Sequence, residues 1–212
     1  MTGLKICGLT RESDVVAAVR CGAAACGFIL SPSKRQITAA RARELAEFAG
    51  GTFTVAVVTT ESAAWIAERL DESELDAVQL SAGADGASVT DVRAAAARRG
   101  LRPRVIAAAD TPDAGDSDYV LLDARTPGVY GGTGTTLDWE ALAAGDLPPR
   151  ARLILAGGIT PANAARAVAT VAPGLLDVSS GIESAPGIKD HALLEALFAQ
   201  VALADQRSGA TP

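Results

Sequence analysis

Short apolar runs alternate with longer segments of helical spacing along almost all of this 212-residue chain. Runs rich in Val, Ile and Leu are typical of parallel strands that are buried on both faces, and such strands need a crossover connection between them. The alternation therefore predicts an α/β fold built from successive strand–helix units. We expect strands at 4–7, 25–30, 53–59, 77–81, 104–110, 118–123, 152–156 and 175–179.

Helical segments follow most of these runs and end where glycines occur. Three of them, at 12–21, 39–49 and 89–99, are each followed by glycine, which favours the left-handed backbone of a helix C-cap. Threonines stand where N-caps are expected, at Thr10, Thr38 and Thr60. Only DTPDAGDS separates the fifth run from the sixth, which is too short for a full helix.

Eight strands in a chain of this length predict one domain, a (β/α)8 barrel of the TIM type with a shortened or missing fifth helix. The barrel is expected to span 1–203. Residues 204–212, ADQRSGATP, have the composition of a disordered tail.

The turns after the last two strands carry small residues. RLILA is followed by two glycines, and GLLDV by Ser-Ser-Gly. Thr160 and Pro161 read as the N-cap and first residue of the helix after the first turn. Free N–H groups at a helix N-terminus attract anions, and the last two turns of a barrel commonly hold phosphate. We expect phosphate to bind at Gly157, Gly158, Ser180 and Gly181; two ordinary tight turns are the alternative.

Composition excludes several classes of function. A net charge of −6 with no clustered basic face argues against nucleic acid, so an anionic substrate must be attracted locally. No apolar run approaches the roughly 20 residues that span a bilayer. Three cysteines and no secretory stretch indicate a reducing cytoplasm. A single histidine, His191, argues against a metal site, and no cofactor motif is present.

Alternation of side chains along the strands predicts which residues point into the barrel. Lys5, Cys7, Asp123 and Asp177 face inward, the last three close to carboxyl ends of strands, where barrel enzymes carry their chemistry. A thiolate can act as a base if a neighbour such as Lys5 lowers the pKa of the thiol, and a protonated carboxyl can act as an acid. A small buried hydrophobe and a helix cap are the alternative roles for the cysteine and for Asp123.

Seven segments together resemble the phosphoribosylanthranilate isomerase family of tryptophan biosynthesis. They are KICGLT at 5–10, GFILSPSKRQI at 27–37, VQL at 78–80, LLD at 121–123, GGTGTTLDW at 131–139, AGGITPANA at 156–164 and DVSSGIESAPGIKD at 177–190. They occur in the family's order through nearly the whole chain. KICG, GGTG with the LDW that follows, and DVSSG form a specific combination.

The resemblance implies an Amadori rearrangement of a phosphorylated small molecule without metal or cofactor. It implies that Asp123 is the general acid and Cys7 the general base. Arg35 would bind the anthranilate carboxylate; a solvated loop arginine is the alternative. Gly132 would belong to a mobile loop that closes over substrate, and Asp177 would contact the sugar hydroxyls or orient the site.

One position departs from the resemblance. The family usually continues VQL with His-Gly, whereas this chain has Ser81 there, on the inward face with Gln79. The missing imidazole could lower the rate or mark a paralogue that isomerises a substituted anthranilate phosphoriboside. A pseudoenzyme that binds a phosphorylated sugar is a further alternative. We expect a monomer or a homodimer. The sequence does not separate the two, because an apolar helix face looks the same whether it packs on its own sheet or on another subunit.

Overall fold

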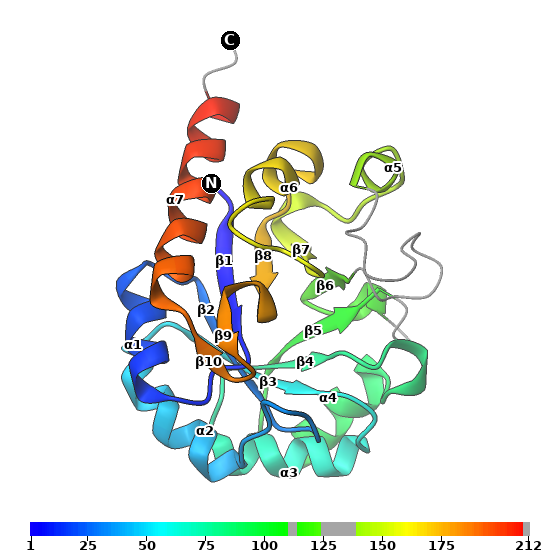
Figure 1. The fold of residues 1–212 in the computed structure, drawn as a ribbon. Helices are drawn as coiled ribbons and strands as arrows, with labels where there is room; N and C mark the ends of the chain where they lie inside the picture. The colour runs from blue at the N-terminus through cyan, green and yellow to red at the C-terminus, as the bar shows by residue number, and fades with distance from the viewer. Residues whose placement is uncertain (110–113, 124–138, 210–212) are drawn as a thin grey trace.

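The computed structural model describes residues 1–109, 114–123 and 139–209. In these residues, eight parallel strands form a closed barrel in which each strand pairs with its neighbours in chain order and the last pairs with the first. Figure 1 shows the strands inside and the helices outside. The strands are β1 (Gly3–Cys7), β2 (Ala25–Ile29), β3 (Phe53–Val58), β4 (Ala77–Leu80), β5 (Arg104–Ala108), β6 (Tyr119–Leu122), β7 (Leu153–Leu155) and β8 (Leu175–Val178). The predicted barrel is confirmed.

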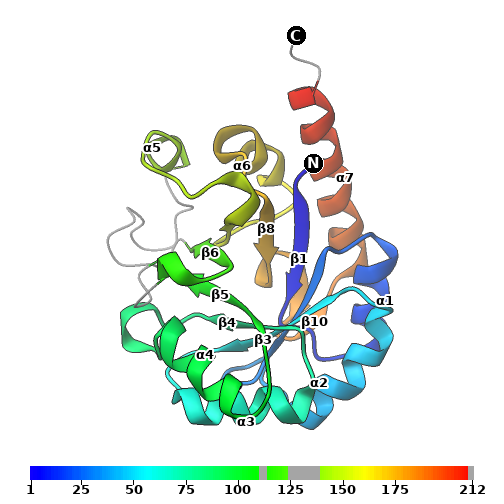
Figure 2. The same cartoon turned by 180° about the vertical axis from the view of Figure 1, so that it is seen from behind.

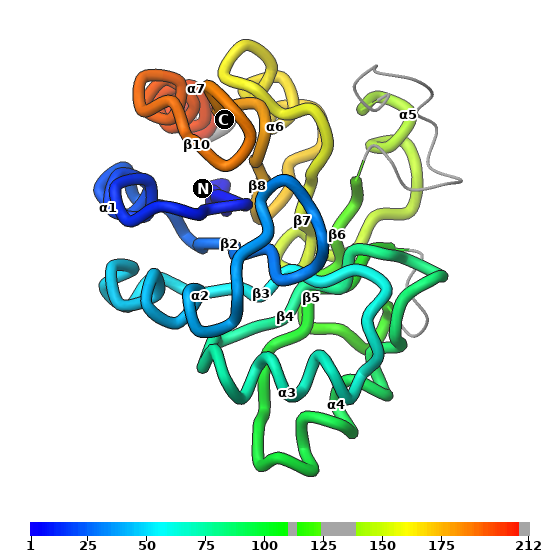
Figure 3. The backbone as a smooth tube through the Cα atoms, turned by 60° about the horizontal axis from the view of Figure 1, so that its bottom comes forward, coloured from blue at the N-terminus to red at the C-terminus, as the bar shows by residue number. Residues whose placement is uncertain are grey.

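Helices surround this barrel, as the reverse view in Figure 2 also shows. They are α1 (Glu12–Arg20), α2 (Ala39–Ala46), α3 (Ala63–Ser73), α4 (Val89–Arg98), α5 (Trp139–Ala143), α6 (Ala164–Val171) and α7 (His191–Gly209). Figure 3 shows α1 to α4 lying outside β1 to β4. None of the described helices is both long enough and apolar enough to cross a membrane.

Short elements complete the fold. Between β5 and β6 the described residues hold only a 3-10 turn, η3 (Ala114–Asp116), as the short connection predicted. The other 3-10 turns are η1 (Glu47–Ala49), η2 (Gly83–Asp85), η4 (Arg150–Arg152) and η5 (Ser180–Ile182). After η5 the chain forms an antiparallel hairpin of β9 (Glu183–Ala185) and β10 (Ile188–Lys189) before α7 begins.

Side chains divide between two apolar clusters, one inside the barrel and one between the strands and the helices. Cys7 and Leu121 belong to the inner cluster. Their neighbours Ile6, Val120 and Leu122 belong to the outer one. The predicted alternation of faces on β1 and β6 is therefore confirmed. Each fully buried Leu or Ile side chain stabilises the fold by about 1.5–3 kcal/mol, so this alternation strongly specifies the register.

The helix ends confirm some predicted caps and correct others. Thr38 accepts a hydrogen bond from the backbone N–H of Arg41 and caps α2 as expected. The predictions for Thr10 and Thr60 are wrong. Arg11 precedes α1, while the Thr10 hydroxyl donates instead to the carbonyl of Gly187 at 2.6 Å. Ser62, directly before α3, is the residue that caps that helix.

The predicted start of α6 at Thr160 and Pro161 is also wrong, because a turn closes ahead of the helix. The side-chain oxygen of Asn163 accepts from the Thr160 N–H at 2.8 Å, and its amide donates to the Gly158 carbonyl at 2.9 Å. The helix therefore begins at Ala164. The turn after β8 likewise leads into η5 and the hairpin, not directly into a long helix.

The chain does not become a disordered tail at residue 204, because α7 continues to Gly209. Ala204 is buried, and the Asp205 carboxylate accepts hydrogen bonds from the Thr2 N–H at 2.6 Å and the Thr2 hydroxyl at 3.2 Å. These contacts attach the last turns of the helix to the beginning of β1.

We predict that Asp205→Ala lowers the free energy of unfolding by about 1–3 kcal/mol, because it leaves the Thr2 N–H without its charged acceptor. Urea unfolding followed by circular dichroism would measure this. Arg207→Ala, two residues further along the same helix and exposed, is the matched control. Equal stability of the two variants would contradict the prediction.

Candidate active site

Lys5 and Asp177 form an ion pair inside the barrel. The Lys5 ammonium donates to the two carboxylate oxygens at 2.9 and 3.0 Å. The two residues lie side by side because β1 pairs with β8 in a register that sets Lys5 opposite Asp177. Both side chains are buried, so each charge depends on the other for compensation. Asp177, which the sequence places at the mouth, is thus held by Lys5.

Cys7 ends β1 on the same inward face and is buried beside this pair. Gly27, on the neighbouring strand β2, provides the space. A Cβ atom at position 27 would lie 3.0 Å from the Lys5 ammonium nitrogen and 3.2 Å from the Cys7 sulfur. Two of the predicted site residues, Cys7 and Asp177, are therefore brought together with Lys5 around a glycine.

Burial and the neighbouring charges together shift the pKa values of Cys7 and Lys5. Burial raises the pKa of the Cys7 thiol, and this effect outweighs the lowering by Lys5 and Lys189, while Asp177 adds to the rise. The expectation that Lys5 lowers the pKa of Cys7 is right for that one interaction but not for the net shift. Burial alone would lower the pKa of Lys5, but the interactions with Asp177 and Cys7 together outweigh it and raise that pKa. The pKa of Lys5 and the pKa of Cys7 are thus both shifted upward.

Arg35, in the segment between β2 and α2, binds the carboxylate of Glu183. Its Nε donates at 2.8 and 3.1 Å to the two oxygens, and its Nη2 donates to one of them at 2.6 Å. The stem of Arg35 crosses Gly8, which has a φ of +71° and whose Cβ, if present, would lie 2.6 Å from the Arg35 Cδ. Arg35 is thus a half-buried side chain held by Glu183 and fitted against Gly8.

Lys189, on β10, connects Glu183 to the ends of β1 and β8. Its ammonium donates to the Cys7 carbonyl at 2.7 Å, the Ser179 carbonyl at 3.1 Å and the Glu183 carboxylate at 2.9 Å. Burial lowers the pKa of Lys189 although Glu183 opposes it. For Glu183 burial raises the pKa, but the hydrogen bonds from Arg35 and Lys189 outweigh it and the pKa is lowered.

Sequence reasoning missed Glu183 and Lys189. Both lie in the segment IESAPGIKD, which the resemblance covered without giving either residue a role. The one available signal was that lysine is rare in this chain, since only Lys5, Lys34 and Lys189 occur. Two of the three are buried in the site.

The two glycine-containing turns after β7 and β8 touch each other. Gly157 and Gly158 have φ angles of +90° and +67°, a conformation that favours glycine. A Cβ on Gly181 would overlap the carbonyl oxygen of Ile159, so only a glycine allows this approach. The structure thus brings together the two turns that contain the four residues predicted to bind phosphate.

Three further predicted site residues are Asp123, Ser81 and Gly132, and the structure describes the first two. Asp123 follows the last residue of β6 and is half-buried. Ser81 accepts a hydrogen bond from the Gln79 amide at 3.0 Å, which confirms that the two share the inward face. Gly132 and the loop that includes it lie outside the described residues.

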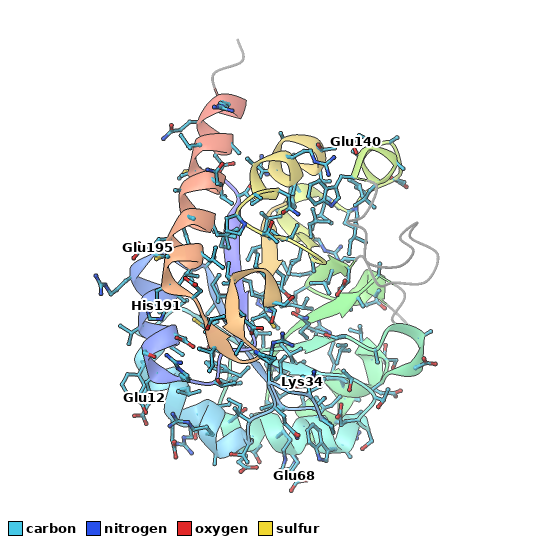
Figure 4. All side chains as sticks on the ribbon, in the orientation of Figure 1. Glu12, Lys34, Glu68, Glu140, His191 and Glu195 are labelled. Atoms are coloured by element: carbon cyan, nitrogen blue, oxygen red, sulfur yellow. The ribbon has the colours of Figure 1, made fainter. Side chains whose placement is uncertain are left out.

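The three lysines differ in exposure. Lys34, next to Arg35, is exposed, unlike the other two lysines. Figure 4 shows Lys34 closer to the middle of the view, and Glu12, Glu68, Glu140 and Glu195 on the outer helices.

Comparison with known proteins identifies the family. Residues 4–200 match the family model described as N-(5'-phosphoribosyl)anthranilate (PRA) isomerase. The chain belongs to this family. A curated relative, N-(5'-phosphoribosyl)anthranilate isomerase from Pseudomonas fluorescens (strain Pf0-1), is 38% identical over 201 residues, which cover 92% of this chain and 95% of the relative. The chain is therefore a phosphoribosylanthranilate isomerase, an enzyme of tryptophan biosynthesis.

Solved structures of this isomerase family have the same fold. TrpF from Jonesia denitrificans superposes with a TM-score of 0.80 at 36% identity, covering 97% of this chain and 98% of that one. A phosphoribosylanthranilate isomerase in complex with reduced 1-(o-carboxyphenylamino)-1-deoxyribulose 5-phosphate has a TM-score of 0.73 at 31% identity, covering 95% of this chain and 99% of that one.

We predict that Lys5→Met lowers the free energy of unfolding by about 3–5 kcal/mol, because it leaves the Asp177 carboxylate buried without a cation. The double variant Lys5→Met with Asp177→Leu should recover most of this loss, since it removes both charges. Chemical denaturation measures the free energy of unfolding of the unmodified protein, the single variant and the double variant.

The control for this prediction is Arg43→Met, which breaks the exposed pair between Arg43 and Glu74. Exposed ion pairs contribute little. If Lys5→Met is no more destabilising than Arg43→Met, the prediction that loss of the buried cation costs about 3–5 kcal/mol is wrong.

Proposed function

We propose that Asp123 and Cys7 are the acid and base of the family's reaction, which converts N-(5-phosphoribosyl)anthranilate to 1-(2-carboxyphenylamino)-1-deoxyribulose 5-phosphate. The observation that carries this proposal is the position of Cys7, inward-facing at the carboxyl end of β1 and between two lysines, in a chain whose family catalyses this isomerisation. Asp123 follows the carboxyl end of β6 in the same barrel.

The first step opens the ribose ring. Asp123 donates its proton to the ring oxygen, the bond from this oxygen to C1 breaks, and the nitrogen lone pair forms a cationic Schiff base with C1. The positive charge on the Schiff base then acidifies the proton on C2, so that a modest base suffices to remove it.

The second step moves the proton from C2 to the Cys7 thiolate, which forms when the thiol proton passes to solvent. The electron pair of the C2–H bond forms a double bond to C1 and neutralises the Schiff base, which gives an enolamine. The enolamine becomes the ketone when C1 is protonated and the C2 hydroxyl loses its proton. Burial works against a thiolate at Cys7, but a cationic Schiff base beside the sulfur would favour it, as Lys5 and Lys189 already do.

We assign the ends of the substrate to separate parts of the mouth. The adjoining turns with Gly157, Gly158, Ser180 and Gly181 would bind the phosphate through backbone N–H groups. Arg35 would bind the aromatic carboxylate, because a planar guanidinium matches a carboxylate with two hydrogen bonds. Asp177 would contact the sugar hydroxyls.

Two buried oxygens support a polar ligand at this place. Neither the Gln79 Oε1 nor the Ser179 hydroxyl has a hydrogen-bond partner among the described residues. Leaving such groups without a partner is unfavourable, and a bound sugar or water would satisfy them.

We infer that the protein works in the cytoplasm as a monomer or a homodimer. Its three cysteines are free thiols, which supports a reducing compartment. The oligomeric state stays a prediction.

We predict that Cys7→Ser and Asp123→Asn each lower kcat by about 10²–10⁴-fold, the range that general acid–base catalysis contributes. The decrease in anthranilate-type fluorescence after mixing with freshly generated phosphoribosylanthranilate measures the rate. Cys26→Ser, which replaces a buried thiol of the outer cluster, is the control. An Asp123→Asn enzyme with unchanged kcat would refute the acid assignment.

We predict that Ser81→His raises kcat/KM for phosphoribosylanthranilate at least about tenfold if the missing imidazole takes part in catalysis. Ser81→Ala, which removes the hydroxyl without adding an imidazole, should not raise it. The same fluorescence assay measures both variants. A fall in kcat/KM for Ser81→His, together with turnover of a ring-substituted substrate by the unmodified enzyme, would favour the altered-substrate paralogue instead.

A further inference from the structure

Glu183 occupies only one edge of the Arg35 guanidinium. An arginine side chain offers two edges to carboxylates, one formed by Nε and one Nη, the other by the two Nη groups. Glu183 bonds to Nε and Nη2. Nη1 has no hydrogen-bond acceptor among the described residues. The second edge of Arg35 therefore has no partner at Nη1 among the described residues, while Glu183 holds the first.

Glu183 is itself held from behind. Its carboxylate, 4% exposed, also accepts from the Lys189 ammonium at 2.9 Å and from the Gly187 N–H at 3.2 Å. The other two hydrogens of the Lys189 ammonium point at the carbonyls of Cys7 and Ser179. The position of Arg35 is thus linked, through two side chains, to the backbone of the residue that carries the thiol.

The net charge of Arg35, Lys189 and Glu183 allows one anion to bind. Arg35 and Lys189 are cations and Glu183 is an anion, so the three side chains together carry one positive charge. A carboxylate that binds the second edge of Arg35 would neutralise it. Without Glu183, two cations would face each other across a buried space, and the arginine stem over Gly8 would lose its partner.

We propose that Glu183 is a positioning residue that, held by Lys189, fixes the Arg35 guanidinium so that its Nη1–Nη2 edge meets the carboxylate of the substrate's aromatic ring. This inference rests on the proposed function, in which Arg35 binds that carboxylate. The opposite role, in which Glu183 competes with the substrate for Arg35, predicts effects of the opposite sign.

The test compares two substrates, phosphoribosylanthranilate and N-(5-phosphoribosyl)aniline, which lacks the carboxylate. The measured quantity is the preference, the ratio of kcat/KM for the first substrate to that for the second. A general disturbance of the barrel lowers both values and leaves this ratio unchanged. The preference therefore reports on the contact with the carboxylate alone.

We predict that Glu183→Gln lowers the preference about tenfold, the value of roughly one charge-assisted hydrogen bond. Arg35→Ala should abolish the preference, and adding Glu183→Gln to it should change the ratio no further, because Glu183 acts through Arg35. Glu12→Gln, at an exposed carboxylate that pairs with Arg41, is the matched control and should keep the original ratio.

Glu183→Asp provides a second variant in case Glu183→Gln does not fold. It keeps the charge beside Lys189 but shortens the reach to Arg35, so a folded enzyme with an intermediate preference is expected. An unchanged or increased preference in a folded Glu183 variant, or a further loss in the Arg35→Ala background, would overturn the proposal.

Assays of the unmodified enzyme distinguish a failure of the proposed function from a failure of the role proposed for Glu183. If it does not isomerise phosphoribosylanthranilate, the proposed function fails and the role of Glu183 fails with it. If it isomerises that substrate but shows no preference for the carboxylate, Arg35 is not its binding group and the positioning role is overturned, while the acid–base assignment stands.

Discussion

The pairing of β1 with β8 is the contact on which this protein depends. It closes the barrel, so that no strand in the sheet is left with an unpaired edge. The same register sets Lys5 beside Asp177, across 172 positions of sequence. It also brings the carbonyl of Cys7 and that of Ser179 to the same ammonium of Lys189. Closure of the fold and assembly of the site are thus the result of one strand pairing.

Buried charge is concentrated where the barrel closes. Lys5 and Lys189 are both inside the protein, each with a carboxylate, and the Cys7 thiol lies between them. Apolar packing of similar volume would often be as stable as such pairs, so their presence is better explained by what they do at the site. They place two positive charges within reach of the Cys7 thiol, which in the proposed mechanism becomes an anion for part of the reaction.

Glycines decide how closely the parts of this site can approach. Gly27 leaves space for Lys5 and Cys7, Gly8 for the stem of Arg35, and Gly181 for the neighbouring turn. Each lies in a segment through which the chain resembles its family. A side chain at any of the three would displace a group that binds or reacts with the substrate in the proposed mechanism.

The sequence by itself determined the barrel, the inward faces of β1 and β6, and the family. These depend on periodic apolar runs and on local motifs, which are readable along the chain. The helix starts near Thr10, Thr60 and Thr160 were predicted wrongly because capping depends on which neighbouring hydroxyl or amide reaches the backbone. The end of α7 was missed because its partner, Thr2, lies at the other end of the chain.

Only the tertiary structure decided the partners within the site. The sequence pointed to Cys7, Asp177 and Arg35, each at the end of a strand or in a family motif. It could not show that Arg35 meets Glu183, 148 positions away, or that Lys189 reaches the end of β1. Nor could it show that burial outweighs Lys5 in setting the pKa of Cys7. Periodicity and motifs are local properties of the chain, whereas ion pairing and desolvation depend on what folding places alongside each group.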